Sequence, residues 1–197
     1  MEKQAGDRRT RKTLAVLRQS LTTLLREKSV KEITVKELTA LADINRGTFY
    51  RHYRDIYDMM EQLENELFDQ FRSMLDAYTA SDLRRGLGPI LSDIFRFIER
   101  NLDLSTALID RGGNTLFLDR LKAAVYDKVF REWAGLYTFE NEKRLNQVLS
   151  FLVGGVIELL RDWMDEGCLQ SPEEMAFLSE QLILFGLGPM EHTHQLR

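Results

Sequence analysis

A helical spacing of apolar residues continues along almost the whole chain of 197 residues, and this pattern limits the fold more than any other feature. Only 3 prolines interrupt it, and the long stretches between them are rich in Leu, Glu, Lys, Arg and Gln, which favour helices. Apolar residues recur three and four positions apart, and no segment alternates as a strand does. We therefore expect an all-α fold of about nine helices.

Composition excludes several other classes of protein. Apolar residues make up 44% of the chain and aromatic residues 10%, which is enough for a core and argues against disorder. The single cysteine, Cys168, rules out a disulfide framework and a cysteine-rich metal cluster. No apolar run is long enough to cross a membrane and no hydrophobic signal segment opens the chain, so we expect a cytoplasmic protein.

Charge is unevenly distributed. Residues 1–54 contain 13 Lys and Arg against 6 Asp and Glu, whereas residues 55–197 contain 14 against 25. The net charge of −4 therefore conceals a basic first part and an acidic remainder. We interpret the two parts as domains, 1–54 and 55–197, of which only the first would approach a polyanion such as nucleic acid. Chance clustering of charged helix faces is the alternative.

Residues 34–53 carry the most informative pattern. They predict two short helices joined by a tight turn, which is a helix-turn-helix. The first begins with the capping box Thr34-Val35-Lys36-Glu37, and the second has Asn45 as its N-cap. Phe49 and Tyr53 stand four residues apart in the second helix and can both face the core.

The other side chains of the second helix suit contact with DNA. Arg46 can donate two hydrogen bonds to guanine N7 and O6, and the hydroxyls of Thr48 and Tyr50 can donate to phosphates. Gly47 costs about 1 kcal/mol of helix propensity, which is tolerable where a side chain would collide with the DNA backbone. The candidate DNA-binding residues are Thr34, Lys36, Asn45, Arg46, Gly47, Thr48, Tyr50, Arg51, His52 and Arg54.

Two of these candidates have alternative interpretations. His52 could be a partly buried histidine that bonds to a carbonyl in the turn, and Arg51 could pair with an acid of the first helix. The basic run from Arg8 to Lys12 could reach a phosphate or an adjacent minor groove, or could be a disordered tail.

The segment resembles the DNA-binding domain of the tetracycline repressor (TetR) family over about residues 8–65. The resemblance rests on the capped helix, the turn of small residues and the run Gly-Thr-aromatic-Tyr-x-His-aromatic, which residues 47–53 match. It implies that Phe49 and Tyr53 belong to the core and that DNA is faced by Arg46, Thr48, Tyr50 and His52. Ile56 stands where the family often has a lysine, so we assign that phosphate contact to Arg54.

The resemblance also implies a larger C-terminal helical domain that binds a small-molecule effector. In the family this region encloses a pocket between helices; the favoured alternative is plain core for the aromatic residues named here and a helix cap for the break at Arg111. The implied pocket residues are Phe95, Ile98, Leu108, Arg111, Phe117, Leu121 and Tyr126.

Apolar faces near the end of the chain predict a homodimer. Gly154 and Gly155 stand within the apolar face of a helix expected near 140–166, where glycine costs stability unless another helix approaches closely. With the helix that Ser171 and Pro172 open, this predicts a four-helix interface and hence a palindromic operator. The expected interface residues are Phe151, Leu152, Gly155, Val156, Leu159, Trp163, Leu178, Leu182 and Phe185.

We therefore expect a ligand-responsive transcriptional regulator, a repressor in preference to an activator of the same fold. No catalytic motif or metal-ligand set is recognisable, so we expect neither an enzyme nor a cofactor or metal. Two Gly-Leu-Gly-Pro copies, Gly86–Pro89 and Gly186–Pro189, are interpreted as breaks between helices, not as nucleotide loops. The alternative function is a helical module that binds small molecules or proteins without regulating DNA.

Overall fold

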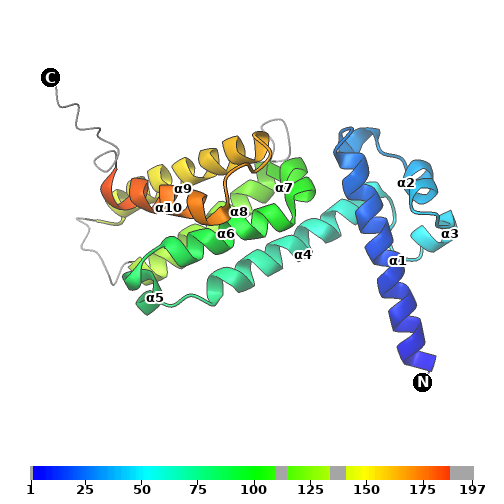
Figure 1. Cartoon of the computed structure of the whole chain (residues 1–197). Helices are drawn as coiled ribbons and strands as arrows, with labels where there is room; N and C mark the ends of the chain where they lie inside the picture. Colours follow the sequence, from blue (N-terminus) through cyan, green and yellow to red (C-terminus); the bar gives the residue numbers. More distant parts are fainter. Residues whose placement is uncertain (1, 110–114, 134–140, 187–197) are drawn as a thin grey trace. The chain divides into compact units, whose positions relative to one another are not determined.

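The computed structural model describes residues 2–109, 115–133 and 141–186. Within these ranges the chain forms ten α-helices and one 3-10 turn, with no strand, which confirms the expected all-α fold (Figure 1). The helix that we did not anticipate is α5 (Ala80–Arg85), a short element that begins with a capping box between Thr79 and Asp82. None of the helices in the described ranges is both long and apolar enough to span a bilayer.

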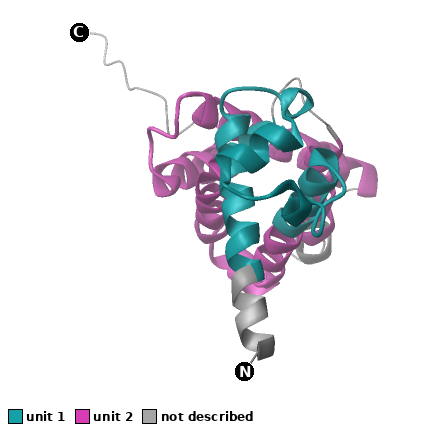
Figure 2. Ribbon diagram, turned by 90° about the vertical axis from the view of Figure 1, so that its right-hand side faces the viewer, with its two compact units in different colours: residues 1–67, 103–113 teal, residues 68–102, 114–197 magenta. Residues whose placement is uncertain are grey.

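The chain divides into two compact units, and the first comprises residues 1–67 and 103–113 (teal in Figure 2). Its core is formed by five completely buried residues from four helices, namely Leu17, Leu21, Leu38, Phe49 and Met59. Its elements are α1 (Glu2–Leu25), the 3-10 turn (Val30–Glu32), α2 (Val35–Leu41), α3 (Arg46–Phe49), the first part of α4 (Ile56–Asp76) and nearly all of α7 (Leu102–Ile109).

The second unit comprises residues 68–102 and 114–197. Its core contains an aromatic pair: Phe95 packs edge-on against Trp163, with ring centroids 5.2 Å apart, and the Trp163 indole N–H donates to the carbonyl of Gln170 at 2.8 Å. Such aromatic pairs add about 0.5–1.5 kcal/mol beyond their buried area. Its elements are the rest of α4, α5, α6 (Gly88–Arg100), α8 (Thr115–Trp133), α9 (Glu142–Asp165) and α10 (Pro172–Phe185).

Two carboxylates of α10 bind α6, which lies beside it in Figure 1. Glu180 accepts hydrogen bonds from the amides of Leu87 at 2.5 Å and Gly88 at 2.8 Å, and Glu173 forms an ion pair with Arg96. A Cβ atom at Gly88 would lie only 3.1 Å from the Glu180 carboxylate. The first Gly-Leu-Gly-Pro is therefore a break between helices, as expected, and its backbone amides also bind the Glu180 carboxylate.

Helix termini agree with the sequence in part. Ser171 and Glu174 form the expected capping box, with Pro172 in the first turn. At α2 only half of the expected box exists: the Thr34 hydroxyl accepts from the Glu37 amide at 3.2 Å, but the Glu37 carboxylate pairs with Lys28. That ion pair lowers the pKa of the Glu37 carboxyl.

Candidate nucleic-acid interface

Helix α3 starts where Asn45 caps it. The Asn45 side-chain oxygen accepts from the Gly47 amide at 2.7 Å, as the sequence predicted. A Cβ atom on residue 47 would lie 3.2 Å from that same oxygen. The cap therefore supplies a local reason for Gly47, which sequence reasoning had attributed to a close approach of DNA.

Two aromatic rings hold α3 to the first unit. Phe49 is 0% exposed and Tyr53 is buried beside it, with ring centroids 5.5 Å apart. Burial also raises the pKa of the Tyr53 hydroxyl. Both residues thus belong to the core, as expected, and the opposite side of α3 is left facing solvent.

The solvent side of α3 presents mainly polar groups. Arg46, Gly47, Tyr50 and Arg51 are exposed, whereas Thr48 is half-buried. The Tyr50 ring stands edge-on to Phe49, with centroids 5.5 Å apart, so a buried ring supports an exposed one. Thr34 and Lys36, at the start of α2, are exposed as well.

Arg51 donates to Thr48, and its alternative partner, an acid of α1, would be Glu2 or Asp7, whose side chains lie outside the described residues. Its guanidinium Nη2 donates to the Thr48 hydroxyl oxygen at 3.0 Å. Because the hydroxyl oxygen accepts this bond, its own hydrogen can be donated elsewhere. Thr48 and Arg51 therefore offer a donor and a positive charge side by side.

Arg54 is already engaged in a hydrogen-bonded ion pair. Its guanidinium donates to the Asp58 carboxylate at 3.1 Å, and its backbone amide donates to the same carboxylate at 2.8 Å. These bonds lower the pKa of the Asp58 carboxyl and raise the pKa of Arg54. A phosphate at this position would have to compete with Asp58, which the sequence did not indicate.

Four of the candidates meet at one hollow of about 530 Å³ within the first unit. Asn45, Thr48, Arg51 and His52 line it together with residues of α1 and of the α2–α3 turn. His52 is half-buried there. Arg46 and Tyr50 do not line this hollow, so the candidate residues fall into two groups on α3.

The implied effector-pocket residues have a different character. Phe95, Ile98, Leu108, Phe117 and Leu121 are all buried, which favours the alternative that they are plain core, and Arg111 lies outside the described residues. Tyr126 is half-buried, and its hydroxyl donates to Ser150 at 3.2 Å.

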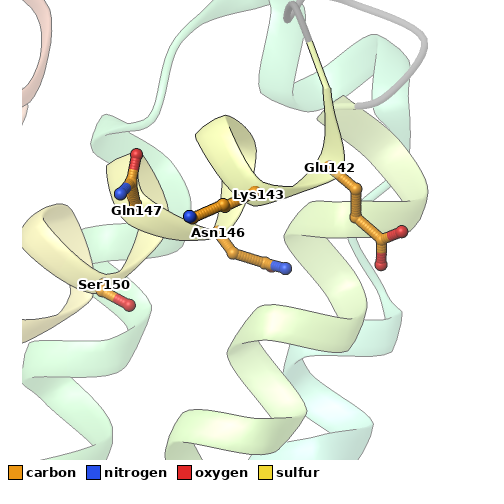
Figure 3. A pocket seen from close by; sticks show the side chains of 5 residues that line it. All are labelled: Glu142, Lys143, Asn146, Gln147 and Ser150. Carbon is orange, nitrogen blue, oxygen red and sulfur yellow. The ribbon is translucent and has the colours of Figure 1, made fainter.

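Two hollows of the second unit are lined by other side chains. One of about 290 Å³ lies between α4 and α8, where the Arg120 guanidinium stacks 4.2 Å from the Phe68 ring centroid. The other, of about 610 Å³, lies at the start of α9 and is lined by polar residues, as Figure 3 shows. These residues are Glu142, Lys143, Asn146, Gln147 and Ser150.

Most of the expected dimer residues are accessible. Phe151 is 79% exposed and Phe185 is 60% exposed, and a Cβ atom on Gly155 would meet no described atom within 4 Å. Leu152, Val156, Leu159, Leu178 and Leu182 are half-buried. Trp163 requires a correction: it is 1% exposed because it packs against Phe95 in the core of its own unit, so it does not belong to a surface.

Comparisons with known proteins agree with this arrangement. A TetR-type family model described as a transcriptional regulator C-terminal region matches residues 87–184. The uncharacterized HTH-type transcriptional regulator YxbF of Bacillus subtilis is 30% identical over 106 residues, which is 50% of this chain. That match covers only 27% of YxbF, so the chain spans about a quarter of the length of this curated relative.

Solved structures resemble most of the chain. A TetR transcriptional regulator from Streptococcus agalactiae has a TM-score of 0.64 at 22% identity, covering 91% of this chain and 98% of that one. The regulator FadR of Bacillus subtilis, solved in complex with stearoyl-CoA, has a TM-score of 0.67 at 15% identity, covering 87% and 98%. At these identities the likeness establishes the fold, and both proteins are described as transcriptional regulators.

Proposed function

We propose that this chain, which belongs to the TetR family of transcriptional regulators, binds operator DNA as a repressor and is released from it by a small-molecule effector. One observation carries the proposal: α3 and the turn after it bury Phe49 and Tyr53 and leave Arg46, Tyr50 and Arg51 exposed. The exposed side belongs to the basic part of the chain, residues 1–54, which we take as the DNA-binding domain.

Chemistry at α3 suits the major groove. The exposed Arg46 can donate two parallel hydrogen bonds to a guanine, a contact worth about 1–3 kcal/mol of discrimination between bases. Tyr50, and Thr48 with its hydrogen free to donate, suit phosphate oxygens, which fix the position of a protein on DNA without reading its sequence.

Exposed apolar side chains on α9 and α10 support the homodimer. Phe151, Phe185 and the open surface at Gly155 would be covered by a second copy of the two helices. A two-fold dimer would place two copies of α3 about 34 Å apart, or somewhat more, and would therefore read a palindromic operator. The residues from 55 onward would form the effector-binding and dimerisation domain.

Effector release would act through a shift between two arrangements of the units. Helix α4 is continuous across their boundary between Leu67 and Phe68. Within the first unit, the Arg26 guanidinium donates two hydrogen bonds to the Asp103 carboxylate, at 2.6 and 2.8 Å. An effector that binds the second unit better in one arrangement lowers DNA affinity by that difference alone.

Selection of bound sequences from random double-stranded DNA tests the proposal, followed by gel shifts with the selected operator. Arg46→Ala should weaken binding and relax base preference at one position in each half-site, whereas Tyr50→Phe should weaken binding with the preference retained. Arg84→Ala, an exposed arginine of α5, is the matched control. Failure of the wild-type protein to bind DNA at low ionic strength would refute the function.

A further inference from the structure

The hollow beside α3 has walls from three parts of the first unit. Thr10 and Thr13 come from α1, Asp43 and Ile44 from the turn before α3, and Thr48, Arg51 and His52 from α3 and the residues after it. Thr10 and Thr13 are three residues apart and so lie on the same face of α1. Neither threonine was a candidate on sequence grounds.

Helical geometry places the hollow on one flank of α3. Successive residues of an α-helix are rotated by about 100°, so with Phe49 facing the core, Arg46 and Tyr50 fall on one flank. Thr48 falls on the other flank, and it lines the hollow together with His52 from the turn after α3. A helix that enters the major groove has a sugar–phosphate strand along each flank, so the hollow would meet one of the two strands.

We propose that this hollow binds one backbone phosphate of operator DNA and that Thr10 and Thr13 are DNA-positioning residues. The inference rests on the proposed function. Two threonine hydroxyls, the Arg51 guanidinium and the His52 ring are hydrogen-bond donors or can become so, which is what a phosphate requires. A water molecule takes about 30 Å³ of liquid, so a hollow of about 530 Å³ has room for a phosphate with its sugar.

Hydrogen bonds already made inside the hollow favour an anion. Arg51 donates to the Thr48 oxygen, so the Thr48 hydroxyl hydrogen can go to a phosphate. The Asn45 side-chain oxygen is used by the Gly47 amide, which leaves its NH₂ group to donate. Asp43 is the carboxylate among the lining residues, and its charge would oppose the phosphate.

The first experiment measures operator affinity of the full chain by fluorescence anisotropy. Thr10→Val with Thr13→Val removes both hydroxyls and keeps the β-branched shape. Binding should weaken at least tenfold, which corresponds to about 1.4 kcal/mol, because each hydroxyl would lose a hydrogen bond to a charged group. Base preference should not change, because phosphate contacts carry no sequence information. Thr23→Val is the matched control, since the Thr23 hydroxyl bonds to the Gln19 carbonyl of the same helix.

A substitution of Asp43 should change the operator affinity in the opposite direction. Asp43→Asn should strengthen binding several-fold by removing the repelling charge, and asparagine tolerates the positive φ of 52° at this position. A protein that is merely sensitive to substitution near α3 would lose affinity with both variants, so the two signs together separate phosphate binding from disturbance of the fold.

Neutral methylphosphonate groups placed singly along the operator complete the test. One position in each half-site should weaken wild-type binding more than it weakens binding by the double threonine variant, as expected when both changes remove parts of the same contact. Equal affinities of the double variant and Thr23→Val, with matching circular dichroism, would overturn the inference while the DNA-binding function stood. No binding by the wild-type protein would overturn the function itself.

Discussion

The two phenylalanines that matter most to the proposed interfaces have opposite environments. Phe49 on α3 is 0% exposed, whereas Phe151 on α9 is 79% exposed. Phe49 is buried beneath the polar surface, so the side chains that would meet DNA are held in place by a ring that does not itself contact DNA. Phe151 is itself part of the proposed dimer surface. A helix of four residues needs such an anchor because it is too short to be stable alone, whereas the long α9 can present apolar side chains directly.

The largest expected difference is in folding. Phe49→Ala should destabilise the protein by about 3–5 kcal/mol and abolish operator binding, because it leaves a cavity under α3. Phe151→Ala removes an exposed ring and should affect stability only through the dimer. Urea unfolding at several protein concentrations checks both: the effect of Phe151→Ala should vary with concentration and that of Phe49→Ala should not. Similar losses for both variants at every concentration would break the comparison.

Association is the next largest effect. Phe151→Asp places a charge in the proposed interface and should produce monomers at micromolar concentration, as measured by analytical ultracentrifugation, without unfolding the chain. Leu116→Asp on α8, also at an exposed apolar residue, is the control that should leave the mass unchanged. A monomeric wild-type protein would contradict the proposed dimer.

A smaller effect is expected inside the second unit. Glu180→Ala leaves the amides of Leu87 and Gly88 without their acceptor and should cost about 1–3 kcal/mol in thermal or urea unfolding. Glu180→Gln keeps an acceptor oxygen and should cost less. Equal costs for the two variants would mean that the carboxylate acts through its charge and not through these two bonds.

The smallest effect is the response to acid. Hydrogen bonds lower the pKa of Asp58 in the first unit and of Glu174 in the second. A lowered pKa in the folded protein adds stability above the ordinary pKa and loses it as the pH falls through the lowered value. Stability should therefore be level from pH 7 to 5 and decline below about pH 4.5. Asp58→Asn and Glu174→Gln should each flatten part of that decline in pH-dependent melting.

Local features of the site could be predicted from the sequence because they depend on neighbours in the chain. The Asn45 cap, and Phe49 with Tyr53 on one side of α3, are separated by no more than four residues. Pairings between distant residues could not be predicted. The hollow, for example, unites α1 with α3. The Arg54–Asp58 pair is local, at a separation of four residues, and was missed because the family pattern assigned Arg54 to a phosphate.

The broad apolar face of α9 shows why the interface prediction failed at Trp163. Periodicity identifies apolar positions but does not say which of them face the protein's own core and which face a partner, so Trp163 and Phe151 were placed together. The implied pocket has the same difficulty, since Phe95 and Phe117 recur with the spacing that either a core or a cavity would need.

The contact between Glu180 and Gly88 joins two positions that stand 92 residues apart in the chain. A side chain at position 88 would press on the end of the Glu180 side chain, so the residue at position 180 would have to shift or become shorter if the helices are to stay paired. Substitutions at these two sites are thus expected to occur in pairs among descendants. Gly86 has a backbone φ of +154°, which other residues rarely adopt. Position 86 should therefore stay glycine whichever residues occupy positions 88 and 180.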